Sequence, residues 1–241
     1  MGLFSLMPYI LASQISKSAS GLWGEGNPYS TDNIYDFCSH DPVSPPVHYD
    51  SHLLKPHSIC HFDAPAHVIH GGDTIDQIFE KNPKIFFGWA EVVNLGKPKF
   101  KPHGKILQMQ HWEVSLEELQ KACDGLQSLQ KIVLSFENIS SDFYVSRDRA
   151  LTLSVEAAQW LSSSPGFNLL GTPWRSVDFQ PGSSERPIHK EIFKNGGILE
   201  CLNLEGIPAG RYFLSAFPIP LKDASESPVC PVLYTQQELI E

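Results

Sequence analysis

The residues best suited to chemistry in this 241-residue chain lie in one short segment, HSICHFDAPAH, at positions 57–67. It contains His57, His61, Asp63 and His67, at intervals of four, two and four residues. Imidazole and carboxylate groups are suitable ligands for Zn²⁺ or Mn²⁺, and a set of three leaves coordination positions open for water. The segment therefore predicts a divalent metal site of the catalytic kind.

Even spacing in this segment predicts an extended strand. Side chains alternate between the two faces of a strand, so His57, His61 and Asp63 would share one face. A helix would turn Asp63 away from the two histidines by about 120°. Because Pro65 has no N–H to donate, we expect regular pairing to end there and the chain to turn, so that His67 approaches the same centre.

Further along the chain, His189 and Glu200 are a second pair of candidate ligands. Residues 190–194 have the pattern of a short helical turn, two glycines end it, and residues 198–204 have the pattern of a strand. Glu200 stands among apolar residues, where a carboxylate is costly to bury unless it is paired or bound to a metal. The alternatives are a solvent-facing strand position for Glu200 and an ordinary surface histidine at position 189.

The elements around these residues indicate a mixed α/β domain, because strand and helix patterns alternate in the middle of the chain. Ser115 begins a helix with a capping box that Gly125 stops, and Ser154 caps a second helix that runs through Leu161. The Pro- and His-rich stretch at 41–56 predicts a loop. The predicted strands are residues 86–95, 131–136, 167–170 and 211–217.

The amino-acid composition is that of a folded, globular protein. Apolar residues make up 41% and charged residues 19% of the chain, and 241 residues fit one large domain. The net charge of -9, without a basic run, argues against nucleic acid as a partner. We therefore expect a small-molecule substrate.

The N-terminal segment and the cysteines give an expectation for the cellular location. The apolar run at residues 1–12 lacks a basic region and is too short to span a membrane, so it predicts a leader and a first strand. The five cysteines, Cys38 among them, are scattered and form no CxxC pair. They indicate neither a disulfide framework nor a thiolate zinc site. We expect a cytoplasmic protein with no membrane partner.

Three segments of the sequence resemble those of a known protein family. HSICHFDAPAH resembles the pattern HxGTHxDxPxH of bacterial kynurenine formamidases, isatin hydrolases and related cyclases. Ile59 and Cys60 replace the usual Gly and Thr. Two later segments, LLGTPWRSVD at 169–178 and PIHKEIFKNGGILECLNL at 187–204, resemble further family segments in the right order. The resemblance covers the chain from about residue 10 to residue 234.

The resemblance implies a swivelling β/β/α fold as one domain over residues 1–241, with a mixed sheet and a few flanking helices, in a homodimer or homotetramer. It also implies one or two divalent ions, with Zn²⁺ favoured and Mn²⁺ as the alternative. The corresponding ligands here are His57, His61, Asp63, His189 and Glu200. The first three would hold one ion, His189 the second, and the two carboxylates would bridge the ions or nearly so.

Two further residues complete the expected active site. We expect His67 to be the catalytic acid/base, with a role as metal ligand or orienting residue as the alternative. Trp23 resembles a substrate-contacting tryptophan of the formamidases and is a candidate aromatic wall for a planar substrate. A simple core position for Trp23 is the alternative.

The resemblance implies hydrolysis of an amide, or of a cyclic amide or ester, by a metal-bound hydroxide, most like an arylformamidase acting on N-formylkynurenine-type substrates. One alternative is an isatin-type or lactone-type hydrolase, or a polyketide-type cyclase, on the same fold. A further alternative is an inactive metal-binding or interaction protein. Departures from the family at Ile59, Cys60, residues 136–138 and Cys230 predict an altered pocket.

Overall fold

The computed structural model describes residues 7–37, 47–104, 106, 108–179 and 184–240. Four parallel strands at the centre of its main sheet are flanked on both sides by antiparallel strands. The strand order is β1 (Tyr9–Ile10), β14 (Val232–Tyr234), β12 (Gly210–Ser215), β5 (Phe87–Asn94), β8 (Lys131–Ser135), β10 (Leu169–Gly171), β11 (Gly197–Glu200), β4 (His61–Asp63) and β13 (Glu226–Pro228). Strands β8, β10 and β11 are buried along their whole length, as parallel strands covered on both faces are.

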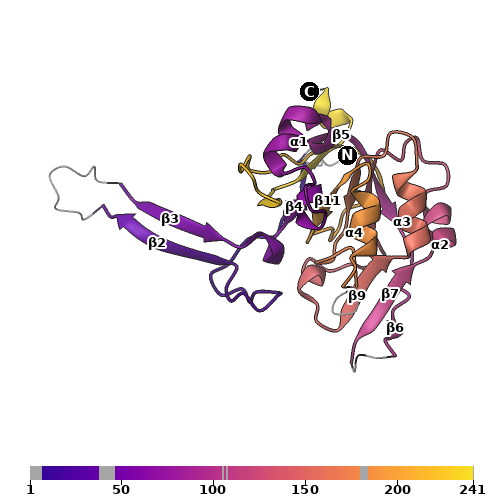
Figure 1. Ribbon diagram of the computed structural model, residues 1–241, viewed down its shortest axis with the longest axis horizontal. Helices are drawn as coiled ribbons and strands as arrows, with labels where there is room; N and C mark the ends of the chain where they lie inside the picture. Colours follow the sequence, from indigo (N-terminus) through magenta and orange to yellow (C-terminus); the bar gives the residue numbers. More distant parts are fainter. Residues whose placement is uncertain (1–6, 38–46, 105, 107, 180–183, 241) are drawn as a thin grey trace, which may run out of the picture.

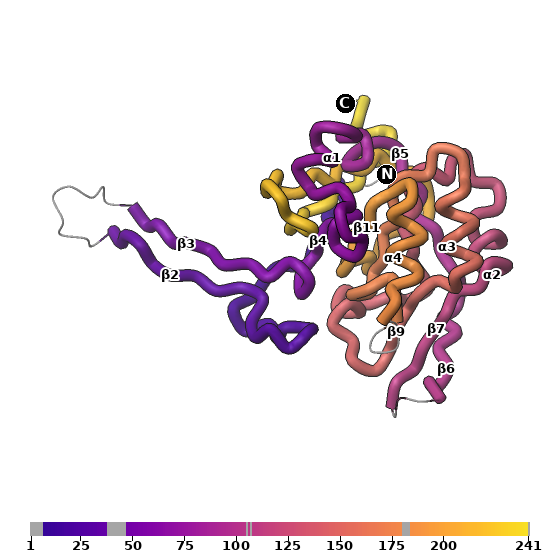
Figure 2. Tube along the Cα trace, viewed as in Figure 1, coloured from indigo at the N-terminus to yellow at the C-terminus, as the bar shows by residue number. Residues whose placement is uncertain are grey.

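Helices cover this sheet where the chain crosses from one parallel strand to the next. The helices in these crossovers are α2 (Leu116–Ala122), α3 (Val155–Ser162) and α4 (Pro187–Ile192), whereas α1 (Ile75–Lys81) lies between β4 and β5. Figures 1 and 2 show α4, α3 and α2 side by side on one side of the molecule. A small sheet of β6 (Lys101–Pro102), β7 (Gln110–Val114) and β9 (Arg149–Leu153) lies below them. The described part of the chain therefore confirms the mixed α/β class.

The predicted helix starts are confirmed by their capping contacts. The Ser115 hydroxyl accepts a hydrogen bond from the Glu118 backbone at 3.2 Å, and the Glu118 carboxylate accepts one from the Ser115 backbone at 2.9 Å. The Ser154 hydroxyl accepts from Ala157 N at 3.2 Å. These contacts satisfy N–H groups that the first turn of a helix leaves without a partner. Local chemistry is thus sufficient to place both helices.

A long two-stranded hairpin projects from the body of the molecule (Figure 1) and consists of β2 (Tyr29–Tyr35) and β3 (Tyr49–Leu54). The predicted loop at 41–56 is therefore wrong for residues 49–54, and residues 41–46 of that prediction lie outside the described residues. Strand β3 depends on hydrogen bonds to β2, which lies before it in the chain. Local composition does not reveal such a partner. We call this hairpin the β2–β3 arm.

Two predicted strands are shorter than expected. The first ligand segment is a 3₁₀ turn, Pro56–Ser58, followed by β4 at 61–63, so the prediction of one strand from His57 to Asp63 is wrong. The strand predicted at 198–204 ends at Glu200, because Cys201 adopts a left-handed conformation with φ of 60°. At its start, a Cβ on Gly197 would lie 2.2 Å from the Phe62 ring. Glycine there lets β4 pack closely beside β11.

Two further findings concern membrane spans and cysteines. Among the residues that the structure describes, no helix is both long and apolar enough to cross a membrane. The four described cysteines are all free: Cys60, Cys123 and Cys201 are buried, and Cys230 is exposed. Cys38 lies outside the described residues. The apolar run at the start is described from residue 7 onward and includes β1.

Candidate metal centre

The candidate ligands meet where β4 lies between β11 and β13. The antiparallel register places Glu200 of β11 opposite His61, and Glu226 of β13 opposite Asp63. His61, Asp63 and Glu200 are each no more than 2% exposed. Sheet pairing thus brings two acidic residues that are far from β4 in sequence next to His61 and Asp63.

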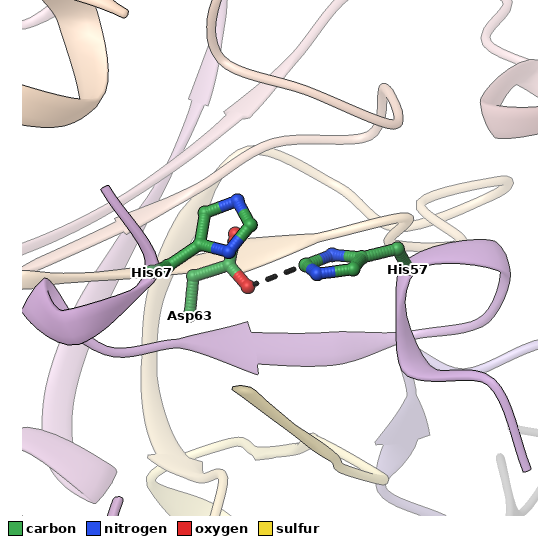
Figure 3. A group of neighbouring side chains, drawn as sticks. All are labelled: His57, Asp63 and His67. Carbon is green, nitrogen blue, oxygen red and sulfur yellow. Dashed lines mark ion pairs between the residues drawn. The ribbon is translucent and has the colours of Figure 1, made fainter. Parts of the chain in front are cut away.

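Asp63 is the centre of this group. Its carboxylate is buried, and neither of its oxygens accepts a hydrogen bond from any described residue. Three imidazole nitrogens face it instead: His61 Nε2 at 3.4 Å, His57 Nδ1 at 3.8 Å and His189 Nε2 at 3.7 Å. Figure 3 shows the His67 ring beside the carboxylate and a dashed line that marks its ion pair with His57. A buried carboxylate without donors is costly, and a cation among these nitrogens would compensate it.

Two of the imidazoles are held with one nitrogen pointing inward. The outer nitrogen of His61, Nδ1, lies 2.8 Å from the carbonyl oxygen of Ile59. The outer nitrogen of His189, Nδ1, lies 2.6 Å from Asp178 Oδ2. This leaves Nε2 of both rings facing Glu200, at 3.6 Å and 3.5 Å. Histidine ligands in metal sites are oriented in this way by an acceptor on the outer nitrogen.

His57 and His67 lie on the two short turns that flank β4, and they complete the group of side chains around Asp63. Nδ1 of His57 lies 3.1 Å from His61 Nε2, and its Nε2 lies 3.8 Å from Glu226 Oε1. Pro65 begins the turn 65–67, as predicted, and the His67 ring lies with its centroid 4.6 Å from that of His57. Burial lowers the pKa of His67. A neutral imidazole at this position can accept a proton or bind a metal.

Two sets of three ligand atoms are close enough to hold an ion. One set comes from His57, Asp63 and His67, and the other from His61, Asp63 and Glu200, with the atoms of each set within 4.8 Å of one another. Asp63 belongs to both sets, so its two oxygens can serve two ions. His189 belongs to neither set, but its Nε2 lies 3.5 Å from Glu200 Oε1. The donor set of imidazole and carboxylate groups therefore fits one or two divalent cations.

Burial and mutual charge set the ionisation of the group. Burial opposes the Asp63 carboxylate, but the charge of His61 and the close approach of the His61 and His189 imidazoles hold the pKa of Asp63 well below its usual range. Burial also opposes a charged His189, yet Asp178 and Asp63 raise the pKa of His189 to about 9. Burial and the charge of Asp63 raise the pKa of Glu200 to about 7. A dication that binds here would displace protons from His189 and Glu200.

The chain matches the model of a known protein family. The family model described as "Putative cyclase" matches residues 12–178, which is more than half of the chain and includes the whole segment 57–67. The chain belongs to the cyclase family. The family resemblance found in the sequence is therefore confirmed.

Two curated relatives of this cyclase-family chain are kynurenine formamidases. That of Polaromonas naphthalenivorans (strain CJ2) is 28% identical over 206 residues, covering 84% of this chain and 82% of the relative. That of Geobacillus thermodenitrificans (strain NG80-2) is 26% identical over 223 residues, covering 92% of this chain and 95% of the relative. Both relatives match the chain over most of their own length.

Solved structures share the fold. Isatin hydrolase A from Ralstonia solanacearum matches with a TM-score of 0.70 at 20% identity, covering 95% of this chain and 92% of that chain. A "predicted metal-dependent hydrolase" from Bacillus stearothermophilus matches with a TM-score of 0.66 at 17% identity, covering 95% and 98%. All the relatives named here are hydrolases, and we assign the cyclase-family chain to the same enzyme class.

A cavity of about 480 Å³ opens onto the candidate metal centre of this cyclase-family chain. His57, His67, His189 and Glu200 line it at the metal centre, and Trp23 lines it as well. Trp23 is 40% exposed, so the alternative of a core tryptophan is wrong. Its indole N–H donates to the His57 carbonyl oxygen at 3.0 Å, which ties the ring to the turn that carries a candidate ligand.

Sequence reasoning did not assign a role to three residues that the structure brings to this site. Asp178 orients His189, Glu226 faces His57, and Arg186 lines the cavity. Asp178 lies in the family-like segment 169–178, which was the available signal. Nothing in the local sequence marks Glu226 or Arg186, because their positions depend on sheet register and on the start of α4.

Proposed function

We propose that the chain is a metal-dependent hydrolase that cleaves an amide bond, most like an arylformamidase acting on N-formylkynurenine-type substrates. The observation that carries the proposal is Asp63: a buried carboxylate without hydrogen bonds, faced by three imidazole nitrogens, two of them from the cavity-lining residues His57 and His189. The kynurenine formamidase relatives support the choice of an acyclic amide. The isatin hydrolase neighbours share the fold, so a lactam or lactone substrate is the second candidate.

The residues of the chain divide into three roles in this proposal. His57, His61, Asp63, His189 and Glu200 would hold one or two divalent ions, with Zn²⁺ favoured by the nitrogen-rich donor set. When bound, the ion supplies a Lewis acid that activates water and polarises the substrate carbonyl. His67, whose pKa burial lowers, would take a proton from the attacking water and pass it to the leaving nitrogen. Trp23 would support the planar ring of the substrate.

The experiment that tests the proposal measures bound metal and turnover on the same sample. Purified protein is treated with chelator, reconstituted with Zn²⁺ or Mn²⁺, and assayed for metal content by mass spectrometry. Turnover is then measured with N-formylkynurenine, isatin and simple lactones. We expect one or two ions per chain and hydrolysis of the formamide. Bound metal with hydrolysis of none of these substrates would favour an inactive metal-binding protein.

Metal affinity is expected to rise with pH. The pKa of His189 is raised to about 9 and that of Glu200 to about 7, so a metal that binds below these values must displace protons. We expect the Zn²⁺ association constant to increase up to about tenfold per pH unit for each proton displaced, measured between about pH 6 and 8 with a chromophoric competitor. An affinity independent of pH would contradict the inclusion of His189 and Glu200 among the ligands.

The metal-free fold is expected to show the opposite trend. Its stabilisation by protonated His189 is complete below the ordinary histidine pKa of 6.5 and is lost as pH rises through about 9. The stabilisation of the fold by protonated Glu200 is likewise lost as pH rises through about 7. Thermal unfolding of chelator-treated protein should therefore occur at lower temperature at pH 9 than at pH 6. The metal-loaded protein should show a smaller difference.

Trp23→Ala is expected to raise KM for an aryl substrate by about tenfold with little change in kcat. The reason is that an aromatic contact contributes about 0.5–1.5 kcal/mol beyond the area it buries. Trp23→Phe keeps the ring but loses the hydrogen bond to the His57 carbonyl, so it separates stacking from positioning of His57. Trp89→Ala, on β5 and outside the cavity lining, is the matched control. A fall in kcat with unchanged KM would contradict a substrate-binding role.

The β2–β3 arm supports the expected homodimer or homotetramer. An isolated two-stranded hairpin is marginally stable in water, and this arm exposes Ile34 at 47%, Tyr49 at 51% and Leu53 at 59%. Exposed apolar side chains gathered on one element are typical of an interface. We propose that the arm packs against a second copy of the chain. Light scattering should show a dimer or tetramer, and Leu53→Asp should shift it towards monomer.

A further inference from the structure

Arg186 is a cation in the cavity wall whose side chain finds no partner among the residues that the structure describes. The other lining cation, Lys55, donates through Nζ to the Glu25 carbonyl oxygen. The acidic neighbour of Arg186 in sequence, Glu185, pairs with Lys190 at 3.7 Å. No carboxylate of the described ranges lies within ion-pair distance of Arg186. Its donors are therefore available to a ligand in the cavity.

The backbone holds Arg186 in a fixed and uncommon conformation. Its φ of 52° and ψ of 52° are left-handed, a region that side-chain-bearing residues rarely adopt. Contacts around it keep this geometry: Lys190 N donates to the Arg186 carbonyl at 3.1 Å, and Ile188 N donates to Asp178 Oδ1 at 3.0 Å. Such conformations persist where the surroundings determine them, and they cluster at ligand sites.

The same contacts fix Arg186 relative to the metal centre. Asp178 accepts hydrogen bonds from the Ile188 and His189 backbones at the start of α4 and also orients the His189 ring. Arg186 lies three residues before His189, at this hydrogen-bonded start of α4. A ligand that spans the cavity would therefore meet the metal centre at His67 and His189 and a guanidinium elsewhere in the wall.

The lining groups differ in what they can bind. The aromatic ring of Trp23 suits a planar group, and its indole lies beneath the guanidinium of Arg175 at 5.3 Å, which holds the ring in place. Glu25, the acidic lining residue outside the metal centre, is already bonded to the Ser58 hydroxyl and the Trp23 backbone. The charged side chain of the wall that no described residue pairs is thus positive. A planar guanidinium pairs with a carboxylate through two parallel hydrogen bonds.

We propose that Arg186 binds a carboxylate of the substrate that lies apart from the scissile amide, so that the preferred substrates are acylated aryl amines with an anionic side chain. This inference rests on the proposed amide hydrolysis. It makes Arg186 a specificity-determining residue that separates such formamides from neutral lactams. The scissile carbonyl of a lactam would occupy the metal centre and leave Arg186 without a partner.

A matched pair of substrates tests the proposal: 4-(2-formamidophenyl)butanoate and its carboxamide, which differ only in the charged end. For the metal-loaded wild-type enzyme we expect kcat/KM about 10–100-fold higher for the carboxylate, because a charge-assisted pair is lost with the carboxamide. Arg186→Gln should raise KM for the carboxylate by a similar factor, leave its kcat and the carboxamide kinetics unchanged, and abolish the preference. Arg186→Lys should restore part of it.

Lys222→Gln, at an exposed lysine outside the cavity lining, is the control and should leave the preference intact. Binding of 4-phenylbutanoate and 4-phenylbutanamide, measured by calorimetry, tests Arg186 without turnover. If neither formamide is hydrolysed but Arg186→Gln weakens 4-phenylbutanoate binding alone, the amidase proposal fails and the carboxylate site stands. Equal binding of 4-phenylbutanoate to wild type and Arg186→Gln, or equal loss of both substrates in the variant, would overturn the role of Arg186.

Discussion

Asp63→Asn is expected to abolish metal binding and to lower kcat/KM by at least about 10³-fold, equivalent to about 4 kcal/mol of transition-state stabilisation. An amide keeps the shape of the carboxylate but has one acceptor oxygen and no negative charge. Both Asp63 oxygens face imidazole nitrogens, and both candidate ion-binding sets contain this residue. Metal content by mass spectrometry and turnover of an aryl formamide measure the two effects.

Asp73→Asn is the matched control for this substitution. Asp73 follows the same segment, but its side chain is 39% exposed and pairs with Lys81 at the surface. Surface ion pairs contribute little, so the control should keep its metal and its activity. Circular dichroism of Asp63→Asn should show a folded protein, since the substitution removes no packing. Full metal occupancy with substantial activity in Asp63→Asn would show that the site assignment is wrong.

His67→Ala is expected to lower kcat by about 10²–10⁴-fold while the protein keeps its full metal content. That factor is the usual contribution of a positioned acid/base to the rate of a proton-transfer step. His67 lies on the turn after β4, in the cavity wall, with its ring centroid 5.6 Å from that of His189. Added imidazole should restore part of the rate, because it can occupy the space that the side chain leaves.

The same variant distinguishes the acid/base role from metal ligation. His67 could hold an ion together with His57 and Asp63, so loss of metal in His67→Ala would identify it as a ligand. In that case imidazole would restore metal binding rather than the proton-transfer rate. His70→Ala, an exposed histidine three residues further along, is the control and should be neutral in both measurements. Unchanged kcat in His67→Ala would exclude both roles.

Predictions from the sequence succeeded for elements whose cause is local. The two capped helices begin at Ser115 and Ser154 as predicted, because the hydroxyl that caps each one lies within the same turn. Strands β5, β8 and β12 follow from runs of β-branched and aromatic residues. Strand β3 was missed and the strand from His57 was too long, because pairing with a distant segment decides both boundaries.

Residue types and spacing in the sequence determined the donor set of the candidate site, namely imidazoles and carboxylates in HSICHFDAPAH, and the family to which the chain belongs. Only the tertiary structure decided how these donors meet. Sheet register sets Glu200 opposite His61, and Asp178 turns one nitrogen of His189 inward. The left-handed start of α4 sets Arg186 in the cavity wall, where no described residue pairs with it. Donor chemistry is a property of single residues, whereas orientation depends on hydrogen bonds between segments far apart in the chain.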